Sequence, residues 1–235
     1  MTDLTTLRFF ATPPHSCSYL DDQDASTIFV DPNQRIDANL YEQLSKHGFR
    51  RSGPHVYRPH CAQCSACIAA RVPVNDFKPS RRHKRCIKAN SDIIVEEIAS
   101  IDTAGHFALY ERYINERHCD GDMYPASKEQ FDSFLSSEWG VTRYFEMKLD
   151  GRIVGVMVSD KLPNGLSAMY TFFDPDLSKR SLGTFAILWQ VGYAQREKMD
   201  YLYLGYWIKE SDKMNYKSQY RPLELLIENK WLLLK

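Results

Sequence analysis

Four cysteines in the first third of the chain have a spacing that suits metal chemistry. Three of them form the pattern Cys61-x2-Cys64-x2-Cys67, and Cys17 precedes them. Thiolates two residues apart on a turn can converge on one soft ion, since zinc and iron–sulfur iron prefer sulfur ligands. The spacing therefore predicts a metal site made of Cys17, Cys61, Cys64 and Cys67, holding zinc or an iron–sulfur cluster.

Two alternatives to this site stay open. Cys86 or His60 can replace Cys17 as the fourth ligand. The cysteines can also pack as reduced thiols, each behaving as a small hydrophobe. The second alternative has weight because a zinc ribbon uses two cysteine pairs far apart, whereas this group is tight.

A cationic segment follows at residues 78–88. It carries six Lys and Arg residues and no carboxylate, although the whole chain balances 30 basic against 30 acidic residues. The pattern predicts a helix that begins at Ser80. We favour contact with nucleic-acid phosphates over a merely solvated helix face. The candidate contacts are Arg81, Arg82, Lys84, Arg85 and Lys88.

Two aromatic strands are predicted at residues 167–173 and 201–208, with an amphipathic helix between them. A strand–helix–strand unit with short connections places its strands parallel in one sheet. Ligands of open α/β sheets lie beyond the carboxyl ends of such strands. The loop after the second strand is therefore a candidate cationic wall for an acidic ligand; its side chains include Lys217, Tyr220 and Arg221.

The elements from about residue 100 onward are two helices, three antiparallel strands, a helix and a parallel strand. Asp150-Gly151 and Asn164-Gly165 supply the tight turns between the antiparallel strands. The sheet must splay where the parallel strand joins, as in the GNAT acyltransferase fold. We predict an α+β protein in which a smaller, cysteine-containing α+β domain (residues 1–100) precedes a GNAT-like acyltransferase domain (residues 101–235).

Composition excludes several classes of protein. The chain is 43% hydrophobic and 26% charged, as in ordinary globular proteins. It has no apolar run long enough to span a membrane and no signal peptide in Met1-Thr2-Asp3-Leu4-Thr5, so a cytoplasmic protein with reduced cysteines is expected. Walker A, Rossmann and Gly-x-Ser-x-Gly patterns are also missing from the sequence.

Together these segments resemble the aminoacyl-tRNA–protein transferases, the arginyl-transferase family. The resemblance covers most of the chain. Its N-terminal part rests on Ser16-Cys17-x-Tyr19-Leu20, Tyr57-Arg58-Pro59-x-Cys61, Arg71-Val72-Pro73-Val74 and Phe77-x-Pro79-Ser80-Arg81. Its C-terminal part rests on Tyr170-x-Phe172-Phe173-Asp174-Pro175, Ser181-Leu182-Gly183-Thr184, Gly205-Tyr206-Trp207-Ile208 and Lys217-x2-Tyr220-Arg221-Pro222.

The short length and layout are similar to the bacterial branch of that family. The resemblance implies an aminoacyltransferase that moves leucine from leucyl-tRNA to proteins beginning with Asp or Glu, which marks them for N-end rule degradation. It also implies two domains that meet near residue 100. Eukaryotic relatives hold an iron–sulfur cluster with an N-terminal Cys-x2-Cys and a later Cys-Cys pair. Here Cys17 stands alone, so the metal role does not transfer directly.

The implied chemistry requires no cofactor, because an aminoacyl ester is already activated. An α-amine with a pKa of about 7.7–8.0 is partly neutral at cytosolic pH, so no covalent nucleophile is required. Proximity and oxyanion stabilisation can then supply the catalysis. We expect Tyr170 or Tyr206 to orient the amine, and Lys217 and Arg221 to pair with the acceptor carboxylate.

Two other functions remain open from the sequence. One is a coenzyme A-dependent GNAT acetyltransferase with a metal-binding extension, although Arg180-Ser181-Leu182-Gly183-Thr184 only faintly resembles a pyrophosphate loop. The other is a non-enzymatic zinc module that binds RNA.

Overall fold

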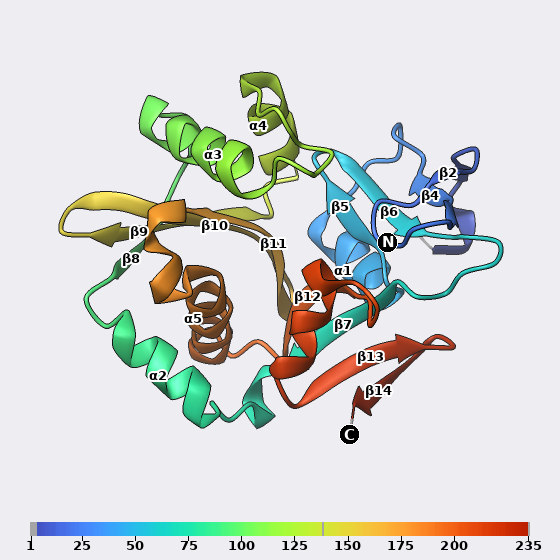
Figure 1. The fold of residues 1–235 in the computed structure, drawn as a ribbon. Helices are drawn as coiled ribbons and strands as arrows, with labels where there is room; N and C mark the ends of the chain where they lie inside the picture. The colour runs from blue at the N-terminus through green and yellow to red at the C-terminus, as the bar shows by residue number, and fades with distance from the viewer. Residues whose placement is uncertain (1–3, 138, 235) are drawn as a thin grey trace.

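The computed structural model describes residues 4–137 and 139–234. Its centre is an eight-stranded mixed sheet, and helices cover both faces (Figure 1). In spatial order the strands are β14 (Lys230–Leu234), β13 (Leu223–Ile227), β7 (Ile68–Pro73), β12 (Tyr201–Trp207), β11 (Gly165–Phe173), β10 (Arg152–Leu162), β9 (Thr142–Leu149) and β8 (Ile94–Ile98).

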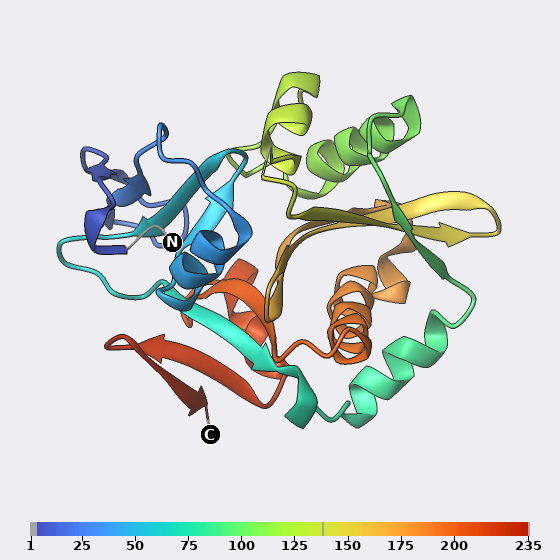
Figure 2. The same ribbon diagram turned by 180° about the vertical axis from the view of Figure 1, so that it is seen from behind.

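A smaller four-stranded sheet packs beside the large one, as both views show (Figures 1 and 2). Its strands are β1 (Phe9–Ala11), β4 (Thr27–Val30), β6 (His55–Pro59) and β5 (Arg50–Ser52), and β2 (His15–Ser16) pairs separately with β3 (Asp24–Ala25). Of the N-terminal segment predicted to lack a signal peptide, residues 1–3 lie outside the described residues.

The α-helices are α1 (Ala38–Lys46), α2 (Arg81–Ala89), α3 (Ala104–Arg117), α4 (Lys128–Leu135), α5 (Leu182–Arg196) and α6 (Asp212–Asn215). Short 3-10 turns are η1 (Leu4–Thr6), η2 (Val74–Asp76), η3 (Pro175–Arg180) and η4 (Tyr216–Gln219). In Figure 1, α3 and α4 lie above the large sheet and α5 and α2 below it.

Local signals explain where these helices begin. Ser80 accepts a hydrogen bond from the His83 N–H and starts α2, and Ser127 accepts one from the Gln130 N–H and starts α4. Ser181 precedes α5, but its φ of +53° is left-handed and its side chain makes no capping hydrogen bond.

The predicted parallel seam is present between β11 and β12. The ladder runs from Gly165–Tyr201 to Ser167–Tyr203, while both strands continue beyond it. On its other side β12 pairs with β7, with a bulge between Tyr203 and Gly205. The two strands therefore diverge after Ser167, which opens the sheet at this point.

Residue 100 does not divide the sheet, because β7 and β8 precede it and lie in the same sheet as β9–β14. The main core joins both sides of that position: it includes Val72 and Phe77 from before it and Phe145 and Leu202 from after it. A second core, around Tyr41 and Leu44, lies under the small sheet. The two predicted domains remain a prediction.

Candidate active site

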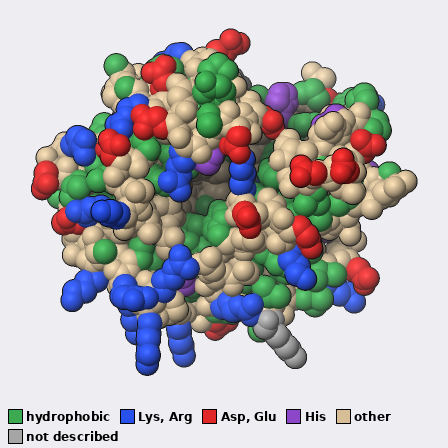
Figure 3. Space-filling model, in the orientation of Figure 1, with side chains coloured by type: hydrophobic (Ala, Val, Ile, Leu, Met, Phe, Trp, Pro, Cys, Tyr) green, Lys and Arg blue, Asp and Glu red, His purple; other side chains and the backbone are tan. Residues whose placement is uncertain are grey.

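The divergence of β11 and β12 coincides with a hollow on the surface. Figure 3 shows this hollow near the centre of the face seen in Figure 1, with apolar side chains on its floor and Lys or Arg side chains at its rim. The strands that flank it carry the two aromatic sequences singled out above. The loop after β12, which contains α6 and η4, lies beside the same opening.

Lys217 is buried beside this opening, with 3% of its surface exposed. Its Nζ lies 3.5 Å from the Met214 sulfur and 4.6 Å from the Tyr216 ring centroid. No ion pair to Lys217 occurs among the described residues. Burial, together with the positive charge of Arg50, lowers the pKa of Lys217 to about 7.

The two other predicted acceptor residues lie in different environments. Tyr220 is buried, and its ring stacks on His83 of α2 with centroids 5.3 Å apart. Arg221 is exposed, and its guanidinium donates to the backbone carbonyls of Ser218 and Leu234 at 3.3 and 3.2 Å. These contacts tie Arg221 to the C-terminal hairpin rather than to Lys217.

The two predicted catalytic tyrosines also differ. The ring of Tyr170 on β11 packs edge-on against Phe134 and Tyr113, with centroids 5.3 and 6.3 Å away. Tyr206 on β12 is buried, and its hydroxyl donates to the Gly48 carbonyl at 2.8 Å. Burial raises the pKa of both phenols, so both are neutral at physiological pH.

The predicted basic helix is α2. All five candidate cations of this helix are exposed, while His83 and Cys86 on the opposite side are buried. Figure 3 shows a dense group of Lys and Arg side chains over the position of α2. The amphipathic spacing of the helix thus separates a packed side from a cationic surface.

A pocket of about 220 Å³ lies between α2 and the start of α5. Its cationic lining is Arg82, Arg85, Lys179 and Arg180. Arg180 is held by Asp92 through two contacts of 2.7 and 2.9 Å. The Asn90 side-chain amide also donates to the Arg180 carbonyl at 2.9 Å, which anchors the turn before α5 to α2.

The four cysteines of the predicted metal site are partly buried and free. Burial is the main cause that raises the pKa of Cys67 to about 12, and the nearby thiols of Cys17, Cys61 and Cys64 add to it. Within residues 4–137 and 139–234, however, no three His, Cys, Asp or Glu side chains are arranged to hold a metal ion. As they lie, these thiols do not fit the predicted site, and no step below uses a metal.

Comparison with known proteins decides the family. The family model described as "Arginine-tRNA-protein transferase, N terminus" matches residues 15–85. The model described as "Arginine-tRNA-protein transferase, C terminus" matches residues 105–227. The chain belongs to the arginine-tRNA-protein transferase family. The predicted family is therefore confirmed.

Relatives within this family match over their whole length. A protein of Teredinibacter turnerae named aspartate/glutamate leucyltransferase is 58% identical over 233 residues, covering 99% of this chain and 96% of that protein. A Pseudomonas fluorescens protein of the same name is 55% identical over 234 residues, covering 100% of both. These relatives are bacterial, which confirms the predicted branch of the family.

The fold agrees with the predicted GNAT-like arrangement. The structure of FemX superimposes with a TM-score of 0.50 at 10% identity, covering 88% of this chain and 81% of FemX. The prediction of an α+β protein with a GNAT-like C-terminal part is confirmed. In the described part of this family member, no helix is long and apolar enough to cross a membrane.

The sequence interpretation missed Arg50, which is 8% exposed. Its Nη1 donates to the Ser167 hydroxyl at 2.8 Å and its Nη2 to the Ala168 carbonyl at 2.7 Å. A Cβ atom built on Gly205 would lie 3.7 Å from Arg50 Nε and Nη2. The guanidinium therefore lies between β11 and β12, where the strands separate. The only sequence signal was a pair of arginines in a short strand after Gly48.

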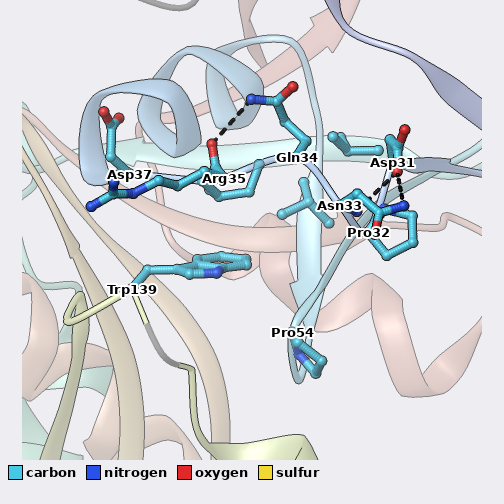
Figure 4. A pocket seen from close by; sticks show the side chains of 11 residues that line it. Asp31, Pro32, Asn33, Gln34, Arg35, Asp37, Pro54 and Trp139 are labelled. Atoms are coloured by element: carbon cyan, nitrogen blue, oxygen red, sulfur yellow. Dashed lines mark hydrogen bonds between the residues drawn. The ribbon is translucent and has the colours of Figure 1, made fainter.

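A larger pocket of about 460 Å³ lies elsewhere, between the loop before α1 and Trp139 (Figure 4). Its carboxylates are already engaged: Asp37 accepts from the Leu40 N–H that starts α1, and Asp31 accepts from Asn33. None of its lining residues is a predicted site residue. We therefore look for the active site at the β11–β12 seam rather than in this pocket.

Proposed function

We propose that this chain transfers leucine from leucyl-tRNA to the α-amine of proteins whose first residue is Asp or Glu. Full-length relatives at 58% and 55% identity carry the name of that activity, which supports the proposal. Because these relatives match over nearly all of this chain, the comparison favours neither a coenzyme A-dependent acetyltransferase nor a non-enzymatic RNA module. An enzyme that uses leucyl-tRNA would act in the cytoplasm.

The observation that carries the proposal is the buried ammonium of Lys217, which makes no ion pair with any residue that the structure describes. A buried charge without a counter-ion is costly, and proteins keep one mainly where a ligand supplies the opposite charge. A carboxylate from the acceptor's first side chain would supply that charge. Asn or Gln at the same position would leave the ammonium unpaired, so the pocket selects acidic residues over their amides.

The cationic surface of α2 would hold the phosphates of the tRNA. Arg81, Lys84, Arg85 and Lys88 are exposed on it, and Arg82 and Arg85 also line the pocket at the start of α5. Contacts of this type position a nucleic acid without reading its bases. They would direct the 3′ end of the tRNA, which carries the leucine ester, toward the seam.

At the seam the neutral α-amine attacks the ester carbonyl carbon. The new C–N bond forms, the C–O bond to the tRNA ribose breaks, and the proton lost by the amine ends on the released ribose hydroxyl. Proximity of the two substrates supplies much of the acceleration. We assign the contact with the amine to Tyr170, because the hydroxyl of Tyr206 already donates to Gly48.

A direct transfer assay tests this function. The protein is mixed with labelled leucyl-tRNA or arginyl-tRNA and with peptides that begin with Asp, Glu, Lys or Ala. We expect label from leucyl-tRNA on the Asp and Glu peptides. Absence of label on both acidic peptides, or equal label on the Ala peptide, would overturn the proposal.

A further inference from the structure

Arg50 and Lys217 form an unusual pair of buried cations. They are 8% and 3% exposed, and neither makes an ion pair within the described residues. The other two buried arginines are paired: Arg51 with Asp160 and Arg71 with Glu224, each at 2.7 Å. Among the described residues, the buried arginines Arg51 and Arg71 therefore have carboxylate partners, whereas Arg50 and Lys217 do not.

The position of Arg50 explains why it stays accessible to a ligand. A guanidinium has five N–H donors. The contacts to Ser167 and Ala168 engage one donor on each terminal nitrogen, and both acceptors belong to β11. Gly205 on β12 faces the guanidinium with no side chain and a φ of +80°. Donors therefore remain on the side of the seam.

We propose that Arg50 and Lys217 together bind one carboxylate, that of the acceptor's first side chain, and that Arg50 is a specificity-determining residue. This inference rests on the proposed leucyl transfer, because it assigns Arg50 to binding the acceptor at the same active site. A carboxylate accepts from a guanidinium through two oxygens, so one oxygen can meet Arg50 while the other meets the ammonium.

The electrostatics of the site agree with this pairing. Burial and the charge of Arg50 both lower the pKa of Lys217. The geometry agrees, because Gly205, which faces Arg50, lies on β12. The Trp207 indole N–H of the same strand donates to the Asn215 carbonyl at 3.2 Å, which holds the loop of Lys217 against β12. Burial raises the pKa of Tyr216, whose ring lies against the ammonium, and the charge of Arg50 offsets part of that rise. One bound carboxylate would relieve the repulsion between both cations, whereas an amide would relieve none of it.

Kinetics of Arg50→Gln test the role of this residue. We expect kcat/KM for Asp and Glu peptides to fall roughly 10- to 100-fold, mainly through KM, as for loss of one charge-assisted hydrogen bond. Affinity for tRNA should not change, and Arg50→Lys should recover part of the loss. The matched control is Arg35→Gln, which removes an exposed arginine on the loop before α1. Unchanged kinetics in Arg50→Gln would overturn the inference.

A second measurement works without tRNA and without transfer. NMR of ¹³C-labelled lysine, assigned with Lys217→Arg, follows the pKa of Lys217. It should rise in Arg50→Gln, and in the wild type it should rise on binding Asp-Ala but not Asn-Ala. A pKa that Arg50→Gln leaves unchanged would contradict the pairing. If Asp-Ala binds as expected but no leucine is transferred, the proposed function fails and the carboxylate site stands.

Discussion

The imidazole of His83 stacks on the ring of Tyr220, with centroids 5.3 Å apart and planes 10° from parallel. His83 belongs to α2, and the Tyr220 N–H donates to the Lys217 carbonyl at 3.1 Å. Beside this stack, Arg82 Nη1 donates to Gln219 Oε1 at 2.9 Å. Helix α2, which is proposed to hold tRNA, is therefore joined by direct contacts to the loop that carries Lys217, the residue proposed to bind the acceptor carboxylate.

His83→Ala should loosen this loop without touching a substrate. An aromatic pair contributes about 0.5–1.5 kcal/mol, so we expect KM for an Asp peptide to rise roughly 2- to 10-fold at saturating leucyl-tRNA. His83→Phe loses the hydrogen bond from the Ser80 N–H but keeps a ring, so its KM should stay near wild type. If both variants shift KM equally, the stack does not position the loop.

The pH dependence of transfer follows from the pKa of Lys217, about 7 in the free protein. Above that pH the ammonium loses its proton, so KM for an Asp peptide should rise up to about tenfold per pH unit. The acceptor amine, with a pKa of about 7.7–8.0, becomes neutral over the same range and favours kcat. We therefore expect kcat/KM to pass through a maximum between about pH 7 and 8.

Lys217→Arg provides the comparison for this profile. A guanidinium stays charged throughout this range, so the rise in KM at high pH should disappear even if affinity is lower. Steady-state kinetics between pH 6 and 9, with enough leucyl-tRNA to saturate, measure both profiles. Identical profiles for the variant and the wild type would show that Lys217 does not cause the decline.

Stability should depend strongly on the pair Arg51–Asp160. Both side chains are fully buried, their closest contact is 2.7 Å, and the Tyr41 hydroxyl also donates to Asp160. Removing one partner of a buried pair leaves an uncompensated charge, so Arg51→Met should lower the free energy of unfolding by about 3–5 kcal/mol. Arg152→Met removes an exposed arginine and should cost at most about 1 kcal/mol. Urea unfolding compares the two, and equal losses would contradict this ranking.

Affinity for tRNA should depend on the exposed side of α2. The double variant Arg81→Ala/Arg85→Ala should weaken binding and reduce the slope of log K against log salt by roughly 1.4–1.8, since each phosphate contact adds about 0.7–0.9. Arg8→Ala/Arg35→Ala removes the same charge from exposed positions elsewhere. Filter binding over a range of salt concentrations measures the slope. A slope that changes equally in both variants would exclude a specific role for α2.

Local sequence signals predicted the elements around the seam. Asp150-Gly151 turns β9 into β10, and the aromatic strands pair in parallel as the strand–helix–strand pattern requires. The turn from β10 into β11 lies at Pro163-Asn164, one residue earlier than predicted, because Gly165 already pairs with Leu162. Ser80 starts α2 as expected. These features depend on residues close together in the chain, which is why the sequence alone was sufficient.

Long-range packing could not be predicted in the same way. Strand β7 lies between β13 and β12, which come more than 120 residues later in the chain. Arg50 and Arg51 look like surface residues in the sequence, yet both are buried against β10 and β11. Arg221 was grouped with Lys217 by proximity in sequence, whereas its guanidinium contacts the end of β14. Helices and strands repeat their side-chain directions with a fixed period, but an irregular loop does not. The sequence therefore does not show which way a loop side chain points.

The central claim is that the buried ammonium of Lys217 reads an acceptor carboxylate. The most direct test is the ratio of kcat/KM for leucyl transfer to two peptides that differ only in a first Asp or Asn, in wild type and in Lys217→Met. We predict a strong preference for Asp in the wild type that collapses in Lys217→Met, while tRNA affinity is retained. A wild type that accepts Asn equally well, or a variant that keeps the full preference for Asp, would contradict the account.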